Sequence, residues 1–482
     1  MLTELLQSLF ANIWTLFLVI LFFGGSIFVH ELGHFLAARS RGVHVERFSI
    51  GFGPAIFSWH RDGVEYRIAW IPLGGYVLLP QLADLGPIEG KSERTAEELP
   101  PVSYTSRMIV FVAGAVFNVL FAFLLAGIIW IVGQNEDSDY ASTRIGYISR
   151  THELPDHVTV PSPAFEAGLK VGDNIRAIDG KSVGNWGDVQ YMIGLGAGTT
   201  ADGRREAVFT VDRDGHTMDI SVHPRIAAEG RERKVGIAPG YELLVQNVTP
   251  DSIADRVGFK KDDEVLKLDG MATINWLTFY ELLDASAKRT ATAQVKRGGQ
   301  ELSLSIPPHA KVKTMADLGL VPTTGVRLVH PTPVAQISKL IVMTIGTIQS
   351  LFNRHSDVHA SSLSGPIDIL AMFHSAAQAG LIPLLSFTIL VNVNLAVFNL
   401  LPIPILDGGQ MLFATIGKLR RRALPPNFVI AAQSLAGLFL LVLVLYVSVS
   451  NIQRRMEQSR NERAEVEAAR PPANPPAAPA KP

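Results

Sequence analysis

Two histidines and a glutamate near the N-terminus follow the order His30-Glu31-x-x-His34. On a helix, residues four apart lie on the same face, so both imidazoles can turn toward one metal ion. Glu31 lies beside that face, where a carboxylate can take a proton from a water that the metal activates. The spacing predicts a hydrolytic metal site with His30 and His34 as ligands and Glu31 as general base.

The surroundings of this motif strengthen the prediction, because it lies in an apolar run over about residues 11–38. In a soluble helix the same short pattern arises by chance as often as it marks a site. In a membrane, each ionisable side chain costs roughly 2.5–3.5 kcal/mol on insertion scales. Three polar groups together therefore call for a metal or a partner.

A third ligand is expected from another apolar run, in which Pro402 and Pro404 interrupt the helical pattern just before Asp407. Catalytic zinc normally has three protein ligands, and a chain without cysteine offers only histidine and carboxylate. Asp407 is the predicted ligand, and the alternative is a helix cap after the prolines. Asn394 and Asn399 are predicted to hold an unwound substrate backbone, the alternative being packing amides between helices.

Composition indicates an integral membrane protein with soluble parts. The chain has 482 residues, 48% of them hydrophobic, with a mean hydropathy of +0.24. Lys and Arg number 43 against 44 Asp and Glu, so no global field recruits nucleic acid. The start of the chain is expected to be a retained first span and not a signal peptide. Basic residues beside the apolar runs place the loops after the first and third runs in the cytoplasm, and residues 135–379 on the other side.

We therefore predict a polytopic α-helical membrane protein with four transmembrane helices, a membrane-associated β-hairpin and two extracytoplasmic PDZ domains of α+β fold. The expected order is a first transmembrane helix with the histidine motif (1–38), a cytoplasmic loop with the hairpin (39–107), a second transmembrane helix (108–134), PDZ domain 1 (135–240), PDZ domain 2 (241–330), an amphipathic helix and linker (331–379), a third transmembrane segment (380–416), a cytoplasmic turn and fourth transmembrane helix (417–450), and a disordered tail that begins with a short helix (451–482).

The hairpin is predicted from two apolar segments, 48–54 and 65–77, on either side of an Asp62-Gly63 turn. Its glycines and apolar character suit a hairpin that dips into a protein-lined cavity of the membrane, although an ordinary cytoplasmic sheet is the alternative. Its edge could pair with an extended substrate. The residues expected to bind substrate there are Gly51, Gly53, Gly74 and Gly75.

The region between the second and third spans contains a repeat, because residues 168–180 recur as 258–270 and Trp186 recurs as Trp276. Each copy resembles a PDZ domain, and PDZ domains bind peptide ends or strands by adding a strand to their own sheet. The pair is therefore expected to filter or sense substrate. Asp262 stands where the first copy has Gly172, which puts a positive φ at that position in doubt.

An apolar stripe at helical spacing follows the repeat, over residues 334–352. It predicts an amphipathic helix lying on the membrane, and a fifth span is the competing interpretation. His355 and His359 are also four apart, but they lie in a polar stretch and are not predicted to bind metal.

Together these motifs resemble the site-2 protease family, in its bacterial sigma-E regulator branch, over nearly the whole chain. The stretch from Ala113 to Asn118 also looks like the family's A-G-P-x-x-N motif, with Ala115 at the place of the proline. The resemblance implies intramembrane proteolysis with Zn²⁺ bound by His30, His34 and Asp407. It also implies that Glu31 activates the water and that Asn394 and Asn399 hold the substrate.

The same resemblance implies partners and a location. Substrates would be single-span membrane proteins such as anti-sigma factors or remnant signal peptides, and the PDZ domains would take peptide or protein ligands. The chain would lie among the lipids of the bacterial inner membrane, with its PDZ domains in the periplasm. Two other hypotheses are a membrane PDZ scaffold with a purely structural metal site and a transporter with a broken helix. The sequence shows no inverted repeat of the kind transporters carry.

Overall fold

The computed structural model describes residues 2–82, 99–154, 158–196, 198–199, 205–226, 233–308, 314–353, 356, 363–422 and 424–468. It divides into two compact units. Unit 1 holds the long helices and the first hairpin and comprises Met1–Ile129, Thr332–Thr344 and His359–Pro482. Unit 2 holds the repeat and comprises Trp130–Pro331 and Ile345–Val358.

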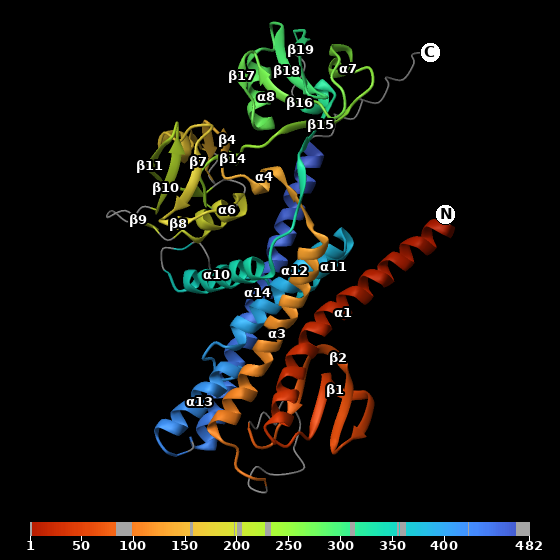
Figure 1. Ribbon diagram of the computed structural model, residues 1–482, viewed down its shortest axis with the longest axis vertical. Coiled ribbons are helices and arrows are strands. Elements are labelled where there is room, and N and C mark those ends of the chain that lie inside the picture. The colour runs from red at the N-terminus through yellow and green to blue at the C-terminus, as the bar shows by residue number, and fades with distance from the viewer. Residues whose placement is uncertain are drawn as a thin grey trace, which may run out of the picture. The chain divides into compact units, whose positions relative to one another are not determined.

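The helices of unit 1 include four that match the expected spans (Figure 1). They are α1 (Leu2–Ser40), α3 (Tyr104–Val132), α12 (Leu381–Asn399) and α14 (Pro426–Ala468), with the shorter α11 (Pro366–Ala379) and α13 (Asp407–Leu419) before and after α12. Among the described residues five helices are long and apolar enough to cross a membrane, because α10 (Pro333–Leu351) also qualifies. Its mean hydropathy is 1.3, whereas the other four reach 2.1 to 2.6.

Polar contacts inside the helix bundle fix the directions of three helices. Asn392 of α12 donates to Ser26 of α1 over 2.8 Å, and one turn or more further along both helices Asn399 meets His30. α1 and α12 therefore run in the same direction. α3 runs in the opposite direction. Its earlier residue Val110 contacts His34, and its later residue Asn118 contacts His30.

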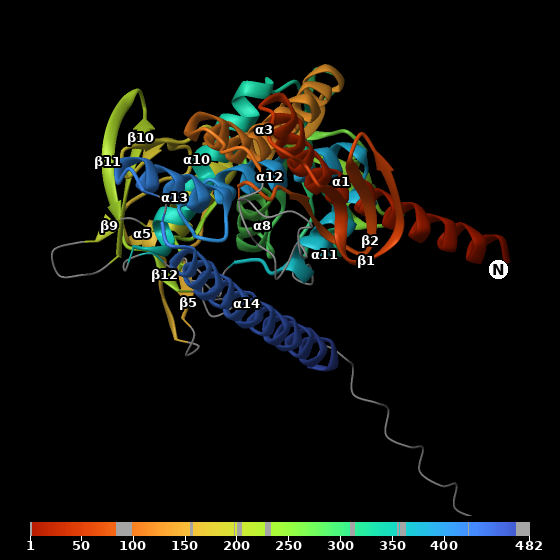
Figure 2. The same cartoon turned by 90° about the horizontal axis from the view of Figure 1, so that it is seen from below.

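The hairpin consists of β1 (Arg47–Arg61) and β2 (Val64–Leu78), which lie beside α1 in both views (Figures 1 and 2). Asp62 and Gly63 adopt φ values of 50° and 77°, so the predicted turn is confirmed. Residues 47–50 of β1 pair with two segments of β2, residues 65–68 and residues 75–78. A strand has only two edges, so these two segments flank β1 on opposite sides.

Two parts of the hairpin differ in their surroundings. Phe48, Val64 and Val77 pack into a core with Ala38 of α1 and Val110 of α3. Elsewhere the hairpin exposes a set of large apolar side chains, namely Ile56, Phe57, Trp59, Trp70 and Ile71. Exposed aromatic and aliphatic groups of this kind favour an environment at the membrane over one in water.

Unit 2 contains two β-rich domains, one for each copy of the repeat, which we call the first and second repeat domains. The first repeat domain comprises β4 (Ile145–Ile148), β5 (Thr151–Glu153), β6 (Thr159–Pro161), α5 (Pro163–Glu166), β7 (Asn174–Ile178), β8 (Lys181–Ser182), α6 (Trp186–Leu195), β9 (Gly198–Thr199), β10 (Arg205–Arg213), β11 (His216–Val222), β12 (Arg225–Ile226), β13 (Arg233–Lys234) and β14 (Ile237–Pro239). Its main sheet has the order β11-β10-β7-β8, and β4 pairs with β14.

The second repeat domain comprises β15 (Leu243–Val248), α7 (Ile253–Val257), β16 (Glu264–Leu268), β17 (Met271–Ala272), α8 (Trp276–Ala285), β18 (Ala291–Arg297), β19 (Gln300–Ile306), α9 (Met315–Leu318) and β20 (Leu320–Thr324). Its sheet has the order β19-β18-β16-β15-β20. β3 (Gln134–Asp137), followed by α4 (Ser138–Ala141), pairs with β21 (Val326–Val329), so the segments that enter and leave the repeat lie side by side.

The repeat extends to individual contacts. In the first repeat domain the buried Asp173 accepts from Arg213 over 2.7 Å, and in the second the buried Asp263 accepts from Arg297 over 2.6 Å. The sequence left open whether Asp262 could adopt the positive φ of its counterpart Gly172. It does, with a φ of 66°, a left-handed conformation that Asp tolerates.

The C-terminal region begins with helix. α14 continues without interruption through Ala468, so the helix at the start of residues 451–482 is longer than the short one predicted. His355 and His359 lie outside the described residues.

Candidate metal centre

His30 and His34 lie four residues apart on α1, as the motif predicts, with His34 almost fully buried. Their Nε2 atoms are 3.2 Å apart. The other ring nitrogen of His34, Nδ1, lies 2.8 Å from the carbonyl oxygen of Val110, which can only accept. His34 therefore carries its proton on Nδ1 and keeps the Nε2 lone pair for a metal.

Asp407 reaches the same point from a different part of the chain. α12 ends at Asn399, the Pro402-Pro404 segment follows, and α13 begins at Asp407. Its Oδ2 atom lies 3.4 Å from both histidine Nε2 atoms. No side chain caps the start of α13, so the Asp407 carboxylate faces the histidines and does not cap the helix.

The three atoms fit a zinc ion. Ligands at the usual Zn–N and Zn–O distances in a tetrahedral site stand about 3.3–3.4 Å apart. The observed separations are 3.2, 3.4 and 3.4 Å. Asp407 Oδ2 is also a buried oxygen with no hydrogen-bond partner, a costly state that a cation at this point would relieve. Among the described residues this is the one group of three or more potential metal ligands.

Asn118 of α3 is an outer partner of the site that sequence reasoning did not assign. Its side-chain amide lies 3.2 Å from Nδ1 of His30 through Nδ2, while its Oδ1 atom is buried without a partner. Amide nitrogen and oxygen exchange places by a half turn of the group. A His30 that binds metal through Nε2 has its proton on Nδ1, so this N–H would donate a hydrogen bond to Oδ1 of the turned amide and give that oxygen a partner.

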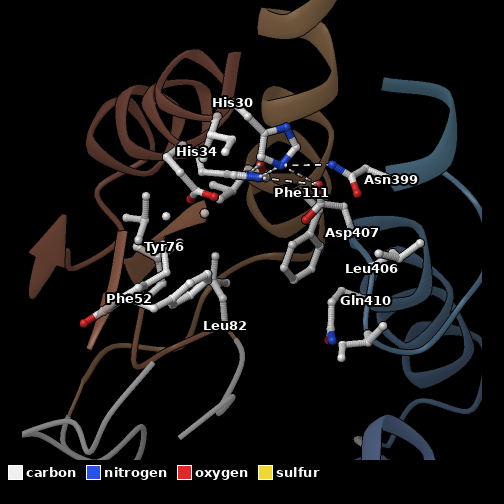
Figure 3. A pocket seen from close by; sticks show the side chains of 18 residues that line it. His30, His34, Phe52, Tyr76, Leu82, Phe111, Asn399, Leu406, Asp407 and Gln410 are labelled. Atoms are coloured by element: carbon white, nitrogen blue, oxygen red, sulfur yellow. Dashed lines mark hydrogen bonds and ion pairs between the residues drawn. The ribbon is translucent and has the colours of Figure 1, made fainter. Parts of the chain in front are cut away.

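A cavity of about 410 Å³ opens beside the metal ligands (Figure 3). His30, His34, Asp407 and Asn399 turn toward one another, and Phe52, Tyr76 and Leu82 line the other side. Glu31 also lines the cavity, and no described group donates a hydrogen bond to its carboxylate.

Only some of the residues predicted to bind substrate line the cavity. Asn399 lines the cavity and its amide lies 3.3 Å from His30 Nε2, whereas Asn394 does not line it and accepts a hydrogen bond from Thr344 of α10 over 2.6 Å. Gly74 and Gly75 line the cavity, while Gly51 and Gly53 do not, although both adopt the positive φ that their position in β1 requires.

Gly114 is a second residue whose role appears only in the structure. A Cβ atom at this position would lie within van der Waals overlap of both imidazoles, 2.6 Å from Cε1 and 2.8 Å from Nε2 of His30. The signal in the sequence is the spacing Gly114-x-x-x-Asn118, which places a gap and an amide on one face of α3.

A His-His-Asp group that could hold a metal, with an adjacent glutamate, carried by apolar helices beside an open cavity, is typical of a membrane-embedded metallohydrolase. The model of Peptidase family M50 matches residues 18–444, and the chain belongs to this family. The predicted resemblance to the site-2 proteases is thereby confirmed, as is the prediction of a zinc metalloprotease.

Several relatives are similar over most of their length. The chain is 29% identical to Regulator of sigma-E protease RseP of Escherichia coli over 452 residues, covering 85% of this chain and 91% of the relative. It is 30% identical to the protein of the same name from Salmonella typhimurium over 441 residues, with the same coverage. A relative from Xylella fastidiosa, named as a zinc metalloprotease, is 28% identical over 459 residues, covering 90% and 96%.

Proposed function

We propose that this protein cuts single-span membrane proteins inside the bilayer, with anti-sigma factors or remnant signal peptides as its substrates. The observation that carries the proposal is the convergence of His30, His34 and Asp407 beside Glu31 within apolar helices. When bound there, zinc polarises the scissile carbonyl and activates a water.

The residues of the chain perform the remaining steps. Glu31 takes a proton from the attacking water and returns it to the leaving amine, since its carboxylate faces the cavity without a competing hydrogen bond from the described residues. His34 is held in the correct tautomer by Val110, and His30 by Asn118 once its amide is turned so that Oδ1 faces Nδ1. Both ligands are therefore oriented before substrate arrives.

Substrate binding is supported by two features of the cavity. A helical substrate hides its peptide bonds, so it must unwind, and its freed backbone groups need partners. Residues 75–78 of β2 pair with β1 along one of their two edges. Gly74 to Val77 also line the cavity, so the other edge of this segment can pair with an extended peptide there. The amide of Asn399 cannot share the His30 Nε2 lone pair with a metal, which frees it to donate to a substrate carbonyl.

The other predicted substrate residues keep that role as part of the proposal. Asn394 would first have to release Thr344. Gly51 and Gly53 would act through the shape they give β1.

The helix directions support four spans with α10 on the membrane surface. If α10 also crossed, α12 would cross in the direction opposite to α1, unless α11 crossed as well. α11 has 14 residues, or about 21 Å of helix against about 30 Å of hydrocarbon. The parallel contacts of α1 with α12 therefore favour four crossings.

The repeat domains then lie outside the cytoplasm, and we propose that they are PDZ domains in the periplasm of a bacterial inner-membrane protein. Each carries the strand-turn pattern of that fold, and their place in the chain, between the second and third spans, suits a filter that substrates must pass before they reach the cavity.

The decisive experiment compares wild type, Glu31→Gln and His34→Ala as full-length protein in detergent, with a tagged single-span substrate and bound zinc measured in each. We expect Glu31→Gln to keep its zinc and to lose activity by about 1,000-fold or more, given the 10²–10⁴-fold typical of a general base. His34→Ala should lose both. A Glu31→Gln protein that cuts normally would refute the role of Glu31, and zinc-loaded wild type that cuts none of several substrates would favour a scaffold.

A further inference from the structure

A second cavity in unit 1, of about 430 Å³, lies between the start of α3 and the end of α13. Four cationic side chains line it, namely Arg107, Lys418, Arg421 and Arg422. None of the described residues that line it is acidic. A concave site with this charge attracts an anion.

Arg107 gives the strongest indication that the cavity has a ligand. Its Nε atom is buried and has no hydrogen-bond partner. A buried guanidinium N–H that remains unpaired is costly, so an acceptor is expected within its reach. Lys418 is already positioned, since its ammonium group stacks 4.0 Å from the centre of the Tyr104 ring at the other wall.

The remaining walls are apolar and include Phe413, Leu424 and Val429. Basic residues near cytoplasmic helix ends can orient a membrane protein from their loops, without a shared cavity. Here the four cationic side chains line one cavity that also has an apolar wall, which suits a ligand with an anionic head and hydrocarbon tails.

We propose that this cavity binds the phosphate of an anionic phospholipid, with Arg107 and Lys418 as the principal contacts. A substrate segment fits less well, because the cytoplasmic flanks of membrane spans are rich in Lys and Arg and would be repelled. Leu82, Phe111 and Gln410 line both this cavity and the one beside the metal ligands, so the lipid would lie against the wall of the metal centre. The proposal does not depend on proteolytic activity.

The test is native mass spectrometry of the full-length protein in detergent, titrated separately with phosphatidylglycerol, phosphatidylcholine and inorganic phosphate. Arg107→Gln/Lys418→Gln removes two cations from the cavity, and Lys418→Gln/Arg422→Gln removes two while keeping Arg107. The matched control is Arg39→Gln/Arg61→Gln, which removes two exposed cations outside it. Thermal unfolding of each protein checks that it is folded.

We expect phosphatidylglycerol to bind wild type at one site and far more tightly than phosphatidylcholine. Each double variant in the cavity should weaken this binding about 30-fold, as expected for two basic groups at an anionic surface, and the control should leave it unchanged. Equal weakening in the control would overturn the proposal, because binding would then reflect surface charge alone. Inorganic phosphate that binds as tightly as the lipid would assign the site to a free anion, and absence of lipid binding to wild type would mean that something else fills the cavity.

Discussion

Replacing Gly114 by alanine tests whether the histidines are placed by the backbone of α3. The added Cβ would stand 2.6 Å from Cε1 and 2.8 Å from Nε2 of His30, and it would also overlap Nε2 of His34. Ordinary contact begins at 3.4 Å, so the His30 ring would have to retreat by 0.6 to 0.8 Å. The obstacle cannot move aside, because a Cβ is fixed to its helix.

The size of this displacement decides the expected effect. Metal–ligand distances tolerate changes of about 0.2 Å, so the ring shift is several times too large. Loss of an outer partner alone costs roughly 10–100-fold in metal affinity, and displacing the ligands themselves should cost about 100-fold or more. The helix should not suffer, since alanine is favoured over glycine there by about 1 kcal/mol.

The assay is zinc content of the detergent-purified protein after dialysis against graded chelator, with helicity followed by circular dichroism. Gly127→Ala is the matched control, because it lies on the same helix and its added Cβ would meet nothing within 4 Å. We expect Gly114→Ala to lose zinc and cleavage while keeping its helicity, and Gly127→Ala to behave as wild type. If Gly114→Ala holds zinc as tightly as wild type, the histidines are not placed by this contact.

Two further predictions concern groups outside the ligand set. Asn118→Asp should retain zinc, because a carboxylate also accepts a hydrogen bond from the imidazole N–H, whereas Asn118→Leu should weaken zinc binding about 10–100-fold in the same chelator assay. Equal affinities of the two variants would show that the amide does not orient His30. In the second repeat domain burial raises the pKa of Asp269, but the N–H of Thr292 and the guanidinium of Arg289 outweigh it and hold that pKa below its usual range. A lowered folded-state pKa stabilises the fold above the unfolded value of about 4 and is lost as the pH falls through the folded value. Hydrogen exchange across β18 between pH 6 and 3 should therefore show less protection at acid pH in wild type, and a flatter profile in Asp269→Asn.

The candidate metal ligands could be picked out in the sequence because each depends on a local pattern. Residues four apart share a face on any helix, which suffices to pair His30 with His34. The Pro402-Pro404 segment breaks the helical pattern, and Asp407 follows that break. The hairpin turn and the tandem repeat likewise follow from short motifs that need no knowledge of the tertiary packing.

The partners of these residues depend on which helix faces which, and one sequence carries little information about that. Asn394 and Asn399 are the same residue type on one helix, yet Asn394 contacts α10 and Asn399 contacts His30. Five residues on a helix correspond to a rotation of about 500°, or 140° beyond a full turn, so the two amides must point in different directions. Their five-residue spacing in the sequence already indicates that the two asparagines share a helix face only loosely.

Gly114 and Val110 together explain how a polar site can be satisfied between apolar helices. In a helix the carbonyl of Val110 already accepts from the N–H of Gly114, four residues later, and a side chain at that later position would cover its second lone pair. With glycine there, the lone pair is open and the His34 imidazole reaches it over 2.8 Å. Gly33 of α1 matches this gap, since a Cβ there would stand 2.5 Å from the carbonyl oxygen of Ala113. The two glycines let α1 and α3 approach closely, so that backbone of one helix orients a ligand of the other and no further polar side chain has to be buried for His34.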